Sequence, residues 1–291
     1  MKVAFLITAY KNPEQIDQFI RLWENPNFHF YIHLDKKIDI NTFSFLTKRL
    51  NVKFISNRVI VRWATFSTAE SVFVSLKEIL SERGDYDYIN LMSGQDFPLM
   101  RATDFIEFLN INRGNQYINC FPYDLQTDWW SRNESRVNTY NFQDWHFPGK
   151  YKIQYIFNLL FKKRPHPKGF VLAGNSNWFC LTADCVAYML KTLDETKGLK
   201  KFFKYVWGAD EFVFSTLAYN SPFRSKIQDN LVYMIWPVHG EAHPVTFKIN
   251  DFDSIIGSGK VFARKFDNKI DSEILKKLES ELFHNTNLQN K

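Results

Sequence analysis

The chain contains 291 residues, of which 45% are hydrophobic, so a disordered chain is excluded and one large α/β domain or two small ones can form a core. Its net charge of +6 suits a partner that carries phosphate: a nucleotide, a nucleic acid or an anionic membrane. Three cysteines without metal-ligand spacing exclude a disulfide framework and a zinc site. No apolar run approaches the roughly 20 residues of a membrane span, so we expect a soluble or peripheral protein.

The first 110 residues alternate short apolar runs with amphipathic patterns. The apolar runs predict strands at 3–10, 28–35, 52–57 and 86–94. Between them we expect a helix at 12–25, opened by Asn12 and Pro13, and a second at 68–84, capped by Thr68. This alternation is typical of a mostly parallel, doubly wound sheet flanked by helices, in which ligands bind beyond the carboxyl ends of the strands.

A polar turn, Ser93 to Asp96, ends the fourth predicted strand and is closed by Pro98. Because it follows a central strand, we expect this turn at the edge of the sheet where a ligand binds.

The second half of the chain has a weaker pattern. Residues 117–170 are rich in aromatic, Arg, Asn and Asp side chains without a clear period, which predicts irregular structure beside a polar cleft. A turn, a short strand and a helix are expected at 174–190, and a helix at 207–223 that begins with Asp210 and Glu211. Carboxylates in the first turn of a helix interact favourably with its dipole, so capping alone explains this pair.

No glycine-rich dinucleotide or P-loop motif is present. Two Asp-x-Asp strings, Asp85-Tyr86-Asp87 and Asp251-Phe252-Asp253, could hold a divalent ion that bridges a diphosphate. The first precedes its strand, at the wrong end of the sheet, and the second suits a helix cap. We therefore interpret both as turn or cap residues.

A basic amphipathic segment covers residues 150–164. Two interpretations remain open: a helix packed on the core with a basic exposed end, and a helix lying on an anionic membrane surface. The basic residues are Lys150, Lys152, Lys162, Lys163 and Arg164.

Six strings occur in an order that resembles a known family: IHLDKK, YINLMSGQDFPL, GNSNWFCLT, GADEFVFSTL, HPVTF and FARKFD. Together they are similar to the core-2/I-branching β-1,6-N-acetylglucosaminyltransferases and the related peptide O-xylosyltransferases, over about residues 2 to 270. The resemblance implies a GT-A-like fold: a single domain at 1–270 with an irregular acceptor-side insertion. Residues 1–110 would form its nucleotide-binding half and 111–270 its acceptor and catalytic half, followed by a C-terminal helix and tail at 271–291.

The resemblance also implies an inverting transfer from a UDP-sugar to a hydroxyl, with no metal or other cofactor. Glu211 matches the family's general base, which removes the proton of the acceptor hydroxyl. Asp210 would be its orienting partner on the acceptor side. Lys265 matches the lysine that binds the diphosphate, and Arg264 is a neighbouring candidate.

Further site residues follow from the same resemblance. Asp35 matches an acidic residue near the uridine and ribose, and Asp96 is expected to orient backbone groups or donor hydroxyls. The remaining candidates are Arg58 and Arg62 for the donor, Arg132, Arg136 and Trp236 for the acceptor, and His243 or Lys248 for a second basic group at the diphosphate.

The sequence departs from the animal members because it lacks their N-terminal anchor and stem and their many cysteines. We therefore expect a bacterial, cytoplasmic enzyme of surface polysaccharide synthesis, associated with the inner face of the membrane. We expect its acceptor to be an oligosaccharide on a lipid diphosphate carrier, and we expect no nucleic-acid partner. Two alternatives stay open: another donor such as UDP-xylose, and a glycan-binding module without catalysis.

Overall fold

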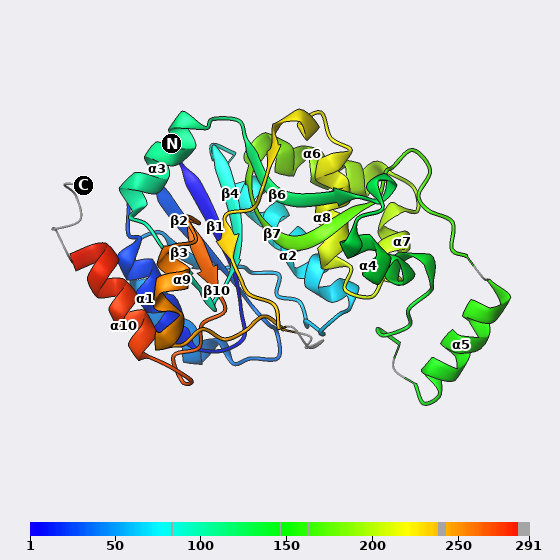
Figure 1. Cartoon of the computed structure of the whole chain (residues 1–291), viewed down its shortest axis with the longest axis horizontal. Coiled ribbons are helices and arrows are strands. Elements are labelled where there is room, and N and C mark those ends of the chain that lie inside the picture. Colours follow the sequence, from blue (N-terminus) through cyan, green and yellow to red (C-terminus); the bar gives the residue numbers. More distant parts are fainter. Residues whose placement is uncertain (83, 146, 162, 238–242, 285–291) are drawn as a thin grey trace.

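The structure, a computed structural model, describes residues 1–82, 84–145, 147–161, 163–237 and 243–284. Its centre is a seven-stranded sheet in the order β3-β2-β1-β4-β7-β6-β8 (Figure 1). Strands β1 to β4 pair in parallel, whereas β7 runs antiparallel to both of its neighbours. The predicted α/β fold with a mostly parallel sheet is confirmed. The strands are β1 (Val3–Ala9), β2 (Phe28–Leu34), β3 (Val52–Phe54), β4 (Tyr88–Ser93), β6 (Gln116–Pro122), β7 (Ala173–Thr182) and β8 (Ile227–Gln228).

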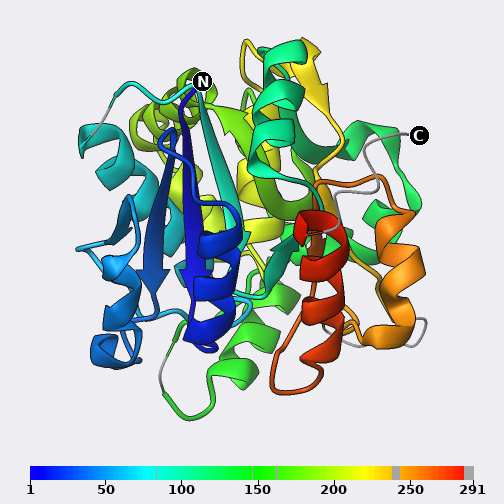
Figure 2. The same cartoon turned by 90° about the vertical axis from the view of Figure 1, so that its left-hand side faces the viewer.

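Helices cover both faces of this sheet (Figures 1 and 2). Side chains alternate along a strand, so β1 sends Phe5 toward α1 and α3 and Leu6 toward α2, α6 and α8. Both faces of β1 are therefore buried, which explains its continuous apolar sequence. The helices are α1 (Pro13–Leu22), α2 (Phe66–Glu82), α3 (Ala102–Ile111), α4 (Asp128–Asn138), α5 (Lys150–Leu160), α6 (Ala183–Glu195), α7 (Leu199–Lys204), α8 (Asp210–Tyr219), α9 (Phe252–Ile256) and α10 (Glu273–Glu279).

A second, three-stranded sheet joins distant parts of the chain. It consists of β5 (Asp96–Pro98), β10 (Phe262–Arg264) and β9 (Val232–Tyr233) in the order β5-β10-β9. In it, Asp96 pairs with Arg264 across antiparallel strands. Helix α10 packs against this sheet through a cluster that includes Phe97 and Leu275. The predicted C-terminal helix is thus part of the body, and residues 285–291 lie outside the described residues.

The predicted elements of the first 110 residues are present, with shifted ends. Strand β3 ends at Phe54, three residues before the predicted end. The prediction that Thr68 caps α2 is wrong. Helix α2 begins at Phe66, where the Oγ1 of Thr65 accepts a hydrogen bond from the Ser67 N–H at 3.2 Å, so Thr68 lies inside the helix.

The prediction of irregular structure at 117–170 is wrong for much of that range. Strand β6 and helices α4 and α5 lie within it or overlap it. Helix α4 is held by Trp130 and Val137, which are buried in the core on one of its faces. The strand predicted within 174–190 is longer than expected, because β7 extends over ten residues.

Among the described residues, no helix combines the length and the apolar character that crossing a bilayer requires.

Candidate functional site

The carboxyl ends of the parallel strands meet at one edge of the central sheet. Tyr10, Asp35 and the turn after Ser93 follow β1, β2 and β4 at this edge. Because β7 is antiparallel, its first residues reach the same edge. Polar groups from distant parts of the sequence are thereby gathered in one region.

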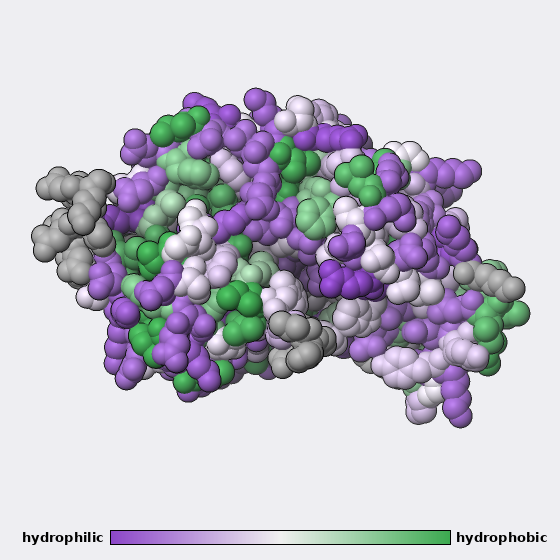
Figure 3. Space-filling model, in the orientation of Figure 1, coloured by the Kyte–Doolittle hydropathy of each residue, from purple (hydrophilic) through white to green (hydrophobic). Residues whose placement is uncertain are grey.

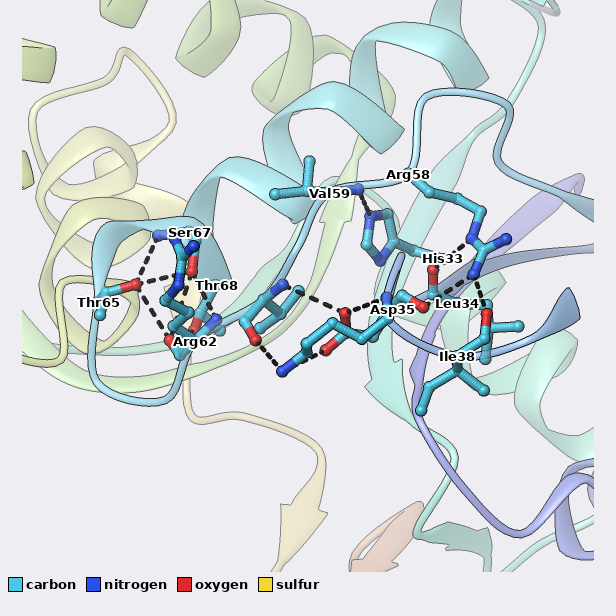
Figure 4. Close-up of polar contacts among 12 residues, drawn as sticks. His33, Leu34, Asp35, Ile38, Arg58, Val59, Arg62, Thr65, Ser67 and Thr68 are labelled. Atoms are coloured by element: carbon cyan, nitrogen blue, oxygen red, sulfur yellow. Dashed lines mark hydrogen bonds and ion pairs between the residues drawn. The ribbon is translucent and has the colours of Figure 1, made fainter. Parts of the chain in front are cut away.

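Asp35 is buried at the end of β2, and its carboxylate is held in place (Figure 4). Its Oδ1 accepts a hydrogen bond from the Lys37 N–H at 3.0 Å, and its Oδ2 lies 3.3 Å from Lys37 Nζ. Arg58 donates to the backbone carbonyls of Leu34, Asp35 and Ile38, so its guanidinium fixes the chain around Asp35. Arg58 is therefore placed to position Asp35.

The loop after β3 is fixed by two further networks (Figure 4). His33 Nε2 accepts a hydrogen bond from the Val59 N–H at 3.1 Å, and burial lowers the pKa of His33 to about 4. This histidine is neutral at pH 7. The backbone of Arg62 is bonded to Ser67, whereas its guanidinium is exposed and forms no ion pair among the described residues.

A cavity of about 580 Å³ lies beside this loop. Its lining includes Arg58, Arg62, Trp145 and Lys204. Neither Glu211 nor Lys265 is among its lining residues.

The turn after β4 orients its own backbone. The carboxylate of Asp96 accepts from the Ser93 N–H at 3.0 Å and from the Ser93 hydroxyl at 2.7 Å. Its side chain is fully buried, and burial raises its pKa. Of the two predicted roles for Asp96, the structure supports orientation of the backbone. Gly94 permits close packing, since a Cβ there would lie 2.7 Å from Ile16 Cδ1.

Arg264 is a buried cation with unmatched donors. Its Nε and Nη1 atoms are buried and form no hydrogen bond among the described residues. The guanidinium carbon lies 3.9 Å from the centre of the Trp178 ring, and Nε lies 3.6 Å from Asp96 Oδ1. Burial lowers the pKa of Arg264, although the carboxylate of Asp96 opposes this effect.

Lys265 follows directly and belongs to a cluster of positive charge. Partial burial lowers its pKa, and the charges of Lys11 and Arg264 lower it further. Lys11 is itself paired with Asp267 at 2.6 Å. His243 lies nearby, since burial and then the charges of Lys265 and Arg264 lower its pKa. Such a cluster favours an anionic ligand.

The two candidates for the second basic group differ in position. His243 lies near Lys265, whereas Lys248 is exposed and its backbone N–H donates to Asp251 at 2.8 Å. Lys11 also lies in this cluster and was not among the sequence candidates.

Glu211 lies in the first turn of α8, where it is paired with Arg136. Arg136 Nη1 donates to Glu211 Oε2 at 2.8 Å, and the same guanidinium binds the carbonyls of Trp207 and Gly208. Glu211 Oε1 has no hydrogen-bond partner among the described residues, and 31% of its side chain is exposed. One carboxylate oxygen of Glu211 is therefore held by Arg136, while the other is open to a ligand.

Asp210 differs from its neighbour. Burial, and then the charge of Glu211, raises the pKa of Asp210 to about 7. Its Oδ2 accepts from Asn177 Nδ2 at 3.1 Å. The two adjacent carboxylates thus have different environments, and Glu211 is the one with an accessible oxygen.

Aromatic rings connect the carboxylate and the cations. The guanidinium of Arg136 lies 4.6 Å from the Trp207 ring, whose centre is 5.3 Å from that of Trp63. Trp63 in turn lies 5.7 Å from His243, which is close to Lys265. Trp63 is 54% exposed, so it lies at the surface between the two groups.

A family model of the Core-2/I-branching enzymes matches residues 3–255. The chain belongs to the Core-2/I-branching enzyme family. The observed α/β architecture agrees with the GT-A-like fold that the family implies. The resemblance read from the sequence is confirmed.

The chain is also similar to individual family members. It is 23% identical to xylosyltransferase 2 of Rattus norvegicus over 305 residues, which cover 97% of this chain and 34% of that protein. It is 23% identical to xylosyltransferase sqv-6 of Caenorhabditis briggsae over 318 residues, which cover 99% of this chain and 38% of that protein. The chain therefore spans about a third of the length of these curated relatives.

Solved structures give weaker similarities. Mouse xyloside xylosyltransferase 1 in its apo form is 12% identical, with a TM-score of 0.39. The match covers 90% of this chain and 96% of the mouse protein chain. Residues 1–349 of TarS from S. aureus have 11% identity and a TM-score of 0.38, covering 78% and 57%. Both scores are below 0.5, so neither similarity supports a conclusion about this chain.

The structure separates the three acceptor candidates of this family member. Arg136 contacts Glu211, whereas Arg132 is exposed on α4 and donates to the carbonyl of Asp128 at 3.2 Å. Trp236 is 53% exposed and immediately precedes Pro237, the last described residue before a gap.

The Asp-x-Asp strings have structural partners. Asp87 accepts from the Lys2 N–H at 2.8 Å before β4, and Asp251 accepts from the Lys248 N–H in a helical turn. Both positions agree with the predicted turn and cap chemistry. Within the described part of the chain, no three His, Cys, Asp or Glu side chains gather as metal ligands would.

Sequence reasoning did not identify Trp63, Lys11 or Asn177. Trp63 follows Arg62 directly, and an exposed tryptophan beside a candidate donor residue is a signal that could have found it. Asn177 lies within the string GNSNWFCLT, but only the fold brings it to Asp210.

Proposed function

We propose that this protein is an inverting, metal-independent glycosyltransferase that moves N-acetylglucosamine from UDP-N-acetylglucosamine to a hydroxyl of a glycan in a β linkage. The observation that carries this proposal is the arrangement of charge around Trp63. An oriented carboxylate with one accessible oxygen, Glu211, lies on one side, and the cations of Arg264 and Lys265 lie on the other.

In the proposed reaction, Glu211 Oε1 accepts the proton of the acceptor hydroxyl as its oxygen attacks the anomeric carbon. The new carbon–oxygen bond forms opposite the breaking bond to UDP, so the configuration at that carbon is inverted. UDP departs with the bonding electron pair, and the proton passes from Glu211 to solvent. Arg136 would orient Glu211 for this step through its contact with Oε2 at 2.8 Å.

The diphosphate would be bound by Lys265 and by Arg264, whose buried donors are unmatched by other described residues. Fixed cations that meet the charge of a leaving group stabilise the transition state without a metal. Asp35 would bind the ribose and uracil, with Arg58 and Asp96 as positioning residues and Arg62 as a further donor contact.

The acceptor proposed here is an oligosaccharide on a lipid diphosphate carrier, in bacterial surface polysaccharide synthesis. Arg132 and Trp236 remain candidates for binding this acceptor, because both are exposed. Asp210 would act through the position of Glu211, its immediate neighbour.

A second candidate keeps the same chemistry with UDP-xylose as the donor. It is favoured by the names of the relatives, several of which are xylosyltransferases at 22–23% identity. The third candidate is a glycan-binding module without catalysis. The accessible carboxylate oxygen of Glu211 argues against it, because binding alone does not require a proton acceptor.

A thermal-shift screen distinguishes these candidates. A ligand at 100 times its Kd stabilises the folded state by about 2.7 kcal/mol. For a chain of this size we expect the melting temperature to rise by about 5 °C or more with the true donor. UDP-N-acetylglucosamine should give the largest rise. A larger rise with UDP-xylose would favour the second candidate, and stabilisation only by oligosaccharides would favour the module. Release of UDP with aryl glycoside acceptors then tests turnover.

A further inference from the structure

Helix α5 stands apart from the layered body, and none of its residues is buried (Figure 1). Two of its polar side chains, Gln154 and Asn158, face the protein. Asn158 accepts from the N–H of Tyr140 and donates to the carbonyl of Tyr140, both at 2.8 Å, and Gln154 Oε1 accepts from the N–H of Phe142 at 2.8 Å. The inner face of α5 therefore carries these two amides together with Phe157, whose ring centre lies 4.9 Å from that of Tyr140.

The solvent-facing side of α5 carries most of its large apolar side chains together with Lys152. Ile156 is 55% and Leu160 73% accessible to solvent. The large exposed apolar side chains of the helix are Tyr151, Ile153, Tyr155, Ile156, Leu159 and Leu160. Figure 3 shows apolar residues gathered at the right-hand end of the molecule, over α5. A surface helix packed on a core turns its apolar stripe inward, whereas most of the large apolar side chains of α5 face solvent. An exposed apolar patch of this kind marks an interaction surface.

Charge around α5 identifies the partner. No Asp or Glu occurs between Asp144 and Asp184 in the sequence, whereas Lys152, Lys163 and Lys168 in this range are exposed. A surface that combines apolar side chains, aromatic rings and lysines matches an anionic bilayer, in which rings lie at the headgroup level and lysines meet lipid phosphates. A second copy of the chain fits less well, because a symmetric contact would bring the same lysines together.

We propose that α5 docks this protein onto an anionic membrane surface, with Ile156 and Leu160 entering the boundary between headgroups and acyl chains. Lys152 and Lys163 meet the lipid phosphates. Arg164 takes no part, contrary to the basic exposed end considered from the sequence, because it is buried and donates to the carbonyls of Phe202 and two other residues. Lys162 lies outside the described residues.

This inference goes beyond the proposed sugar transfer, and its test does not depend on that transfer. The full chain is sedimented with vesicles of phosphatidylglycerol and phosphatidylcholine, and separately with phosphatidylcholine alone. We expect binding to the anionic vesicles that falls at least tenfold in the double variant Ile156→Glu, Leu160→Glu. Lys152→Ser should weaken binding about fivefold.

A matched control is Ile111→Glu, because Ile111 is 75% exposed at the end of α3 and should leave binding unchanged. We expect each variant to be folded, because the substituted side chains face solvent. Circular dichroism and the melting temperature check this. Three results would overturn the proposal: no sedimentation of the wild type, equal sedimentation of the double variant, or a dimer in analytical ultracentrifugation that the double variant dissociates. Equal binding to phosphatidylcholine alone would overturn the role of charge.

Discussion

Replacing Glu211 by Gln separates the proposed catalytic role from a role in the helix. Gln keeps the size of the side chain and an oxygen that can accept from Arg136, but it cannot take up a proton as a carboxylate does. We expect turnover to fall by about 10²–10⁴, which corresponds to about 3–5 kcal/mol of transition-state stabilisation.

The expected effect on stability is much smaller. Glu211 is 31% exposed, and Arg136 keeps bonds to Asn133, Trp207 and Gly208 when the charge of its partner is removed. Loss of a partly exposed ion pair costs about 1 kcal/mol, and the interaction of a carboxylate with the helix dipole contributes a similar amount. We therefore expect the melting temperature to fall by only a few degrees.

The assay measures UDP released from UDP-N-acetylglucosamine in the presence of aryl glycosides, and UDP binding by calorimetry. Binding of UDP should be unchanged in the variant. The matched control is Glu82→Gln, since Glu82 is also ion-paired, to Lys53, and its side chain is 35% exposed. Turnover of Glu211→Gln within about threefold of the wild type, at a melting temperature like that of the control, would show that Glu211 only stabilises the helix.

Three further predictions concern charge elsewhere in the molecule. Lys265→Ala should lower turnover by about 10²–10³ and weaken UDP binding, and Lys265→Arg should restore only part of the lost turnover. Turnover should also persist in excess EDTA. Turnover that EDTA abolishes and Mn²⁺ restores would refute the metal-independent account. Asp210 has a folded-state pKa of about 7, above its ordinary value, so its protonated form stabilises the fold at low pH and this contribution is lost as the pH rises through 7. Relative to Asp210→Asn, the wild type should therefore lose up to about 2–3 kcal/mol of unfolding free energy between pH 5 and pH 8 in urea titrations. Parallel plots of unfolding free energy against pH for the two proteins would contradict the raised pKa of Asp210. Arg164→Ala should lower the unfolding free energy by about 3–5 kcal/mol, because it leaves buried carbonyls without a donor. The control is Lys163→Ala at the exposed neighbouring residue, which should change the unfolding free energy by less than about 0.5 kcal/mol. Equal effects of the two substitutions would show that the burial of Arg164 is unimportant.

Much of the first 110 residues could be predicted from local pattern. The runs around β1 and β2 are continuous and apolar because both faces of these strands are buried, so their ends at Ala9 and Leu34 were within one residue of the predicted limits. The start of α2 was missed because Thr65 and Thr68 are both plausible caps.

The second half could be predicted less well because tertiary contacts decide it. Helix α4 is polar overall, and Trp130 and Val137 mark its inner face only when the core that receives them is known. The reversed direction of β7 depends on pairing with β4, which the alternation of strands and helices does not encode.

In the candidate site, too, the local sequence pattern is visible, whereas the tertiary contacts are not. The string GADEF made Glu211 a candidate, but its pairing with Arg136 joins residues 75 positions apart. A helical period was visible in residues 150–164, yet a period is the same whichever face turns inward. Only the contacts of Gln154, Phe157 and Asn158 show which face of α5 is the inner one.

The return of β10 to the N-terminal part of the fold has a consequence for synthesis of the chain. β10 pairs with β5, and Asp267, just beyond it, is bound by Lys11 and Asn12. A ribosome releases the N-terminal side first, so the strands that lead to Asp35 are available before the segment that carries Arg264 and Lys265 has been synthesised. A nascent chain therefore exposes the surface that β10 later covers, and a ligand of these two cations can assist folding only after that segment has left the ribosome.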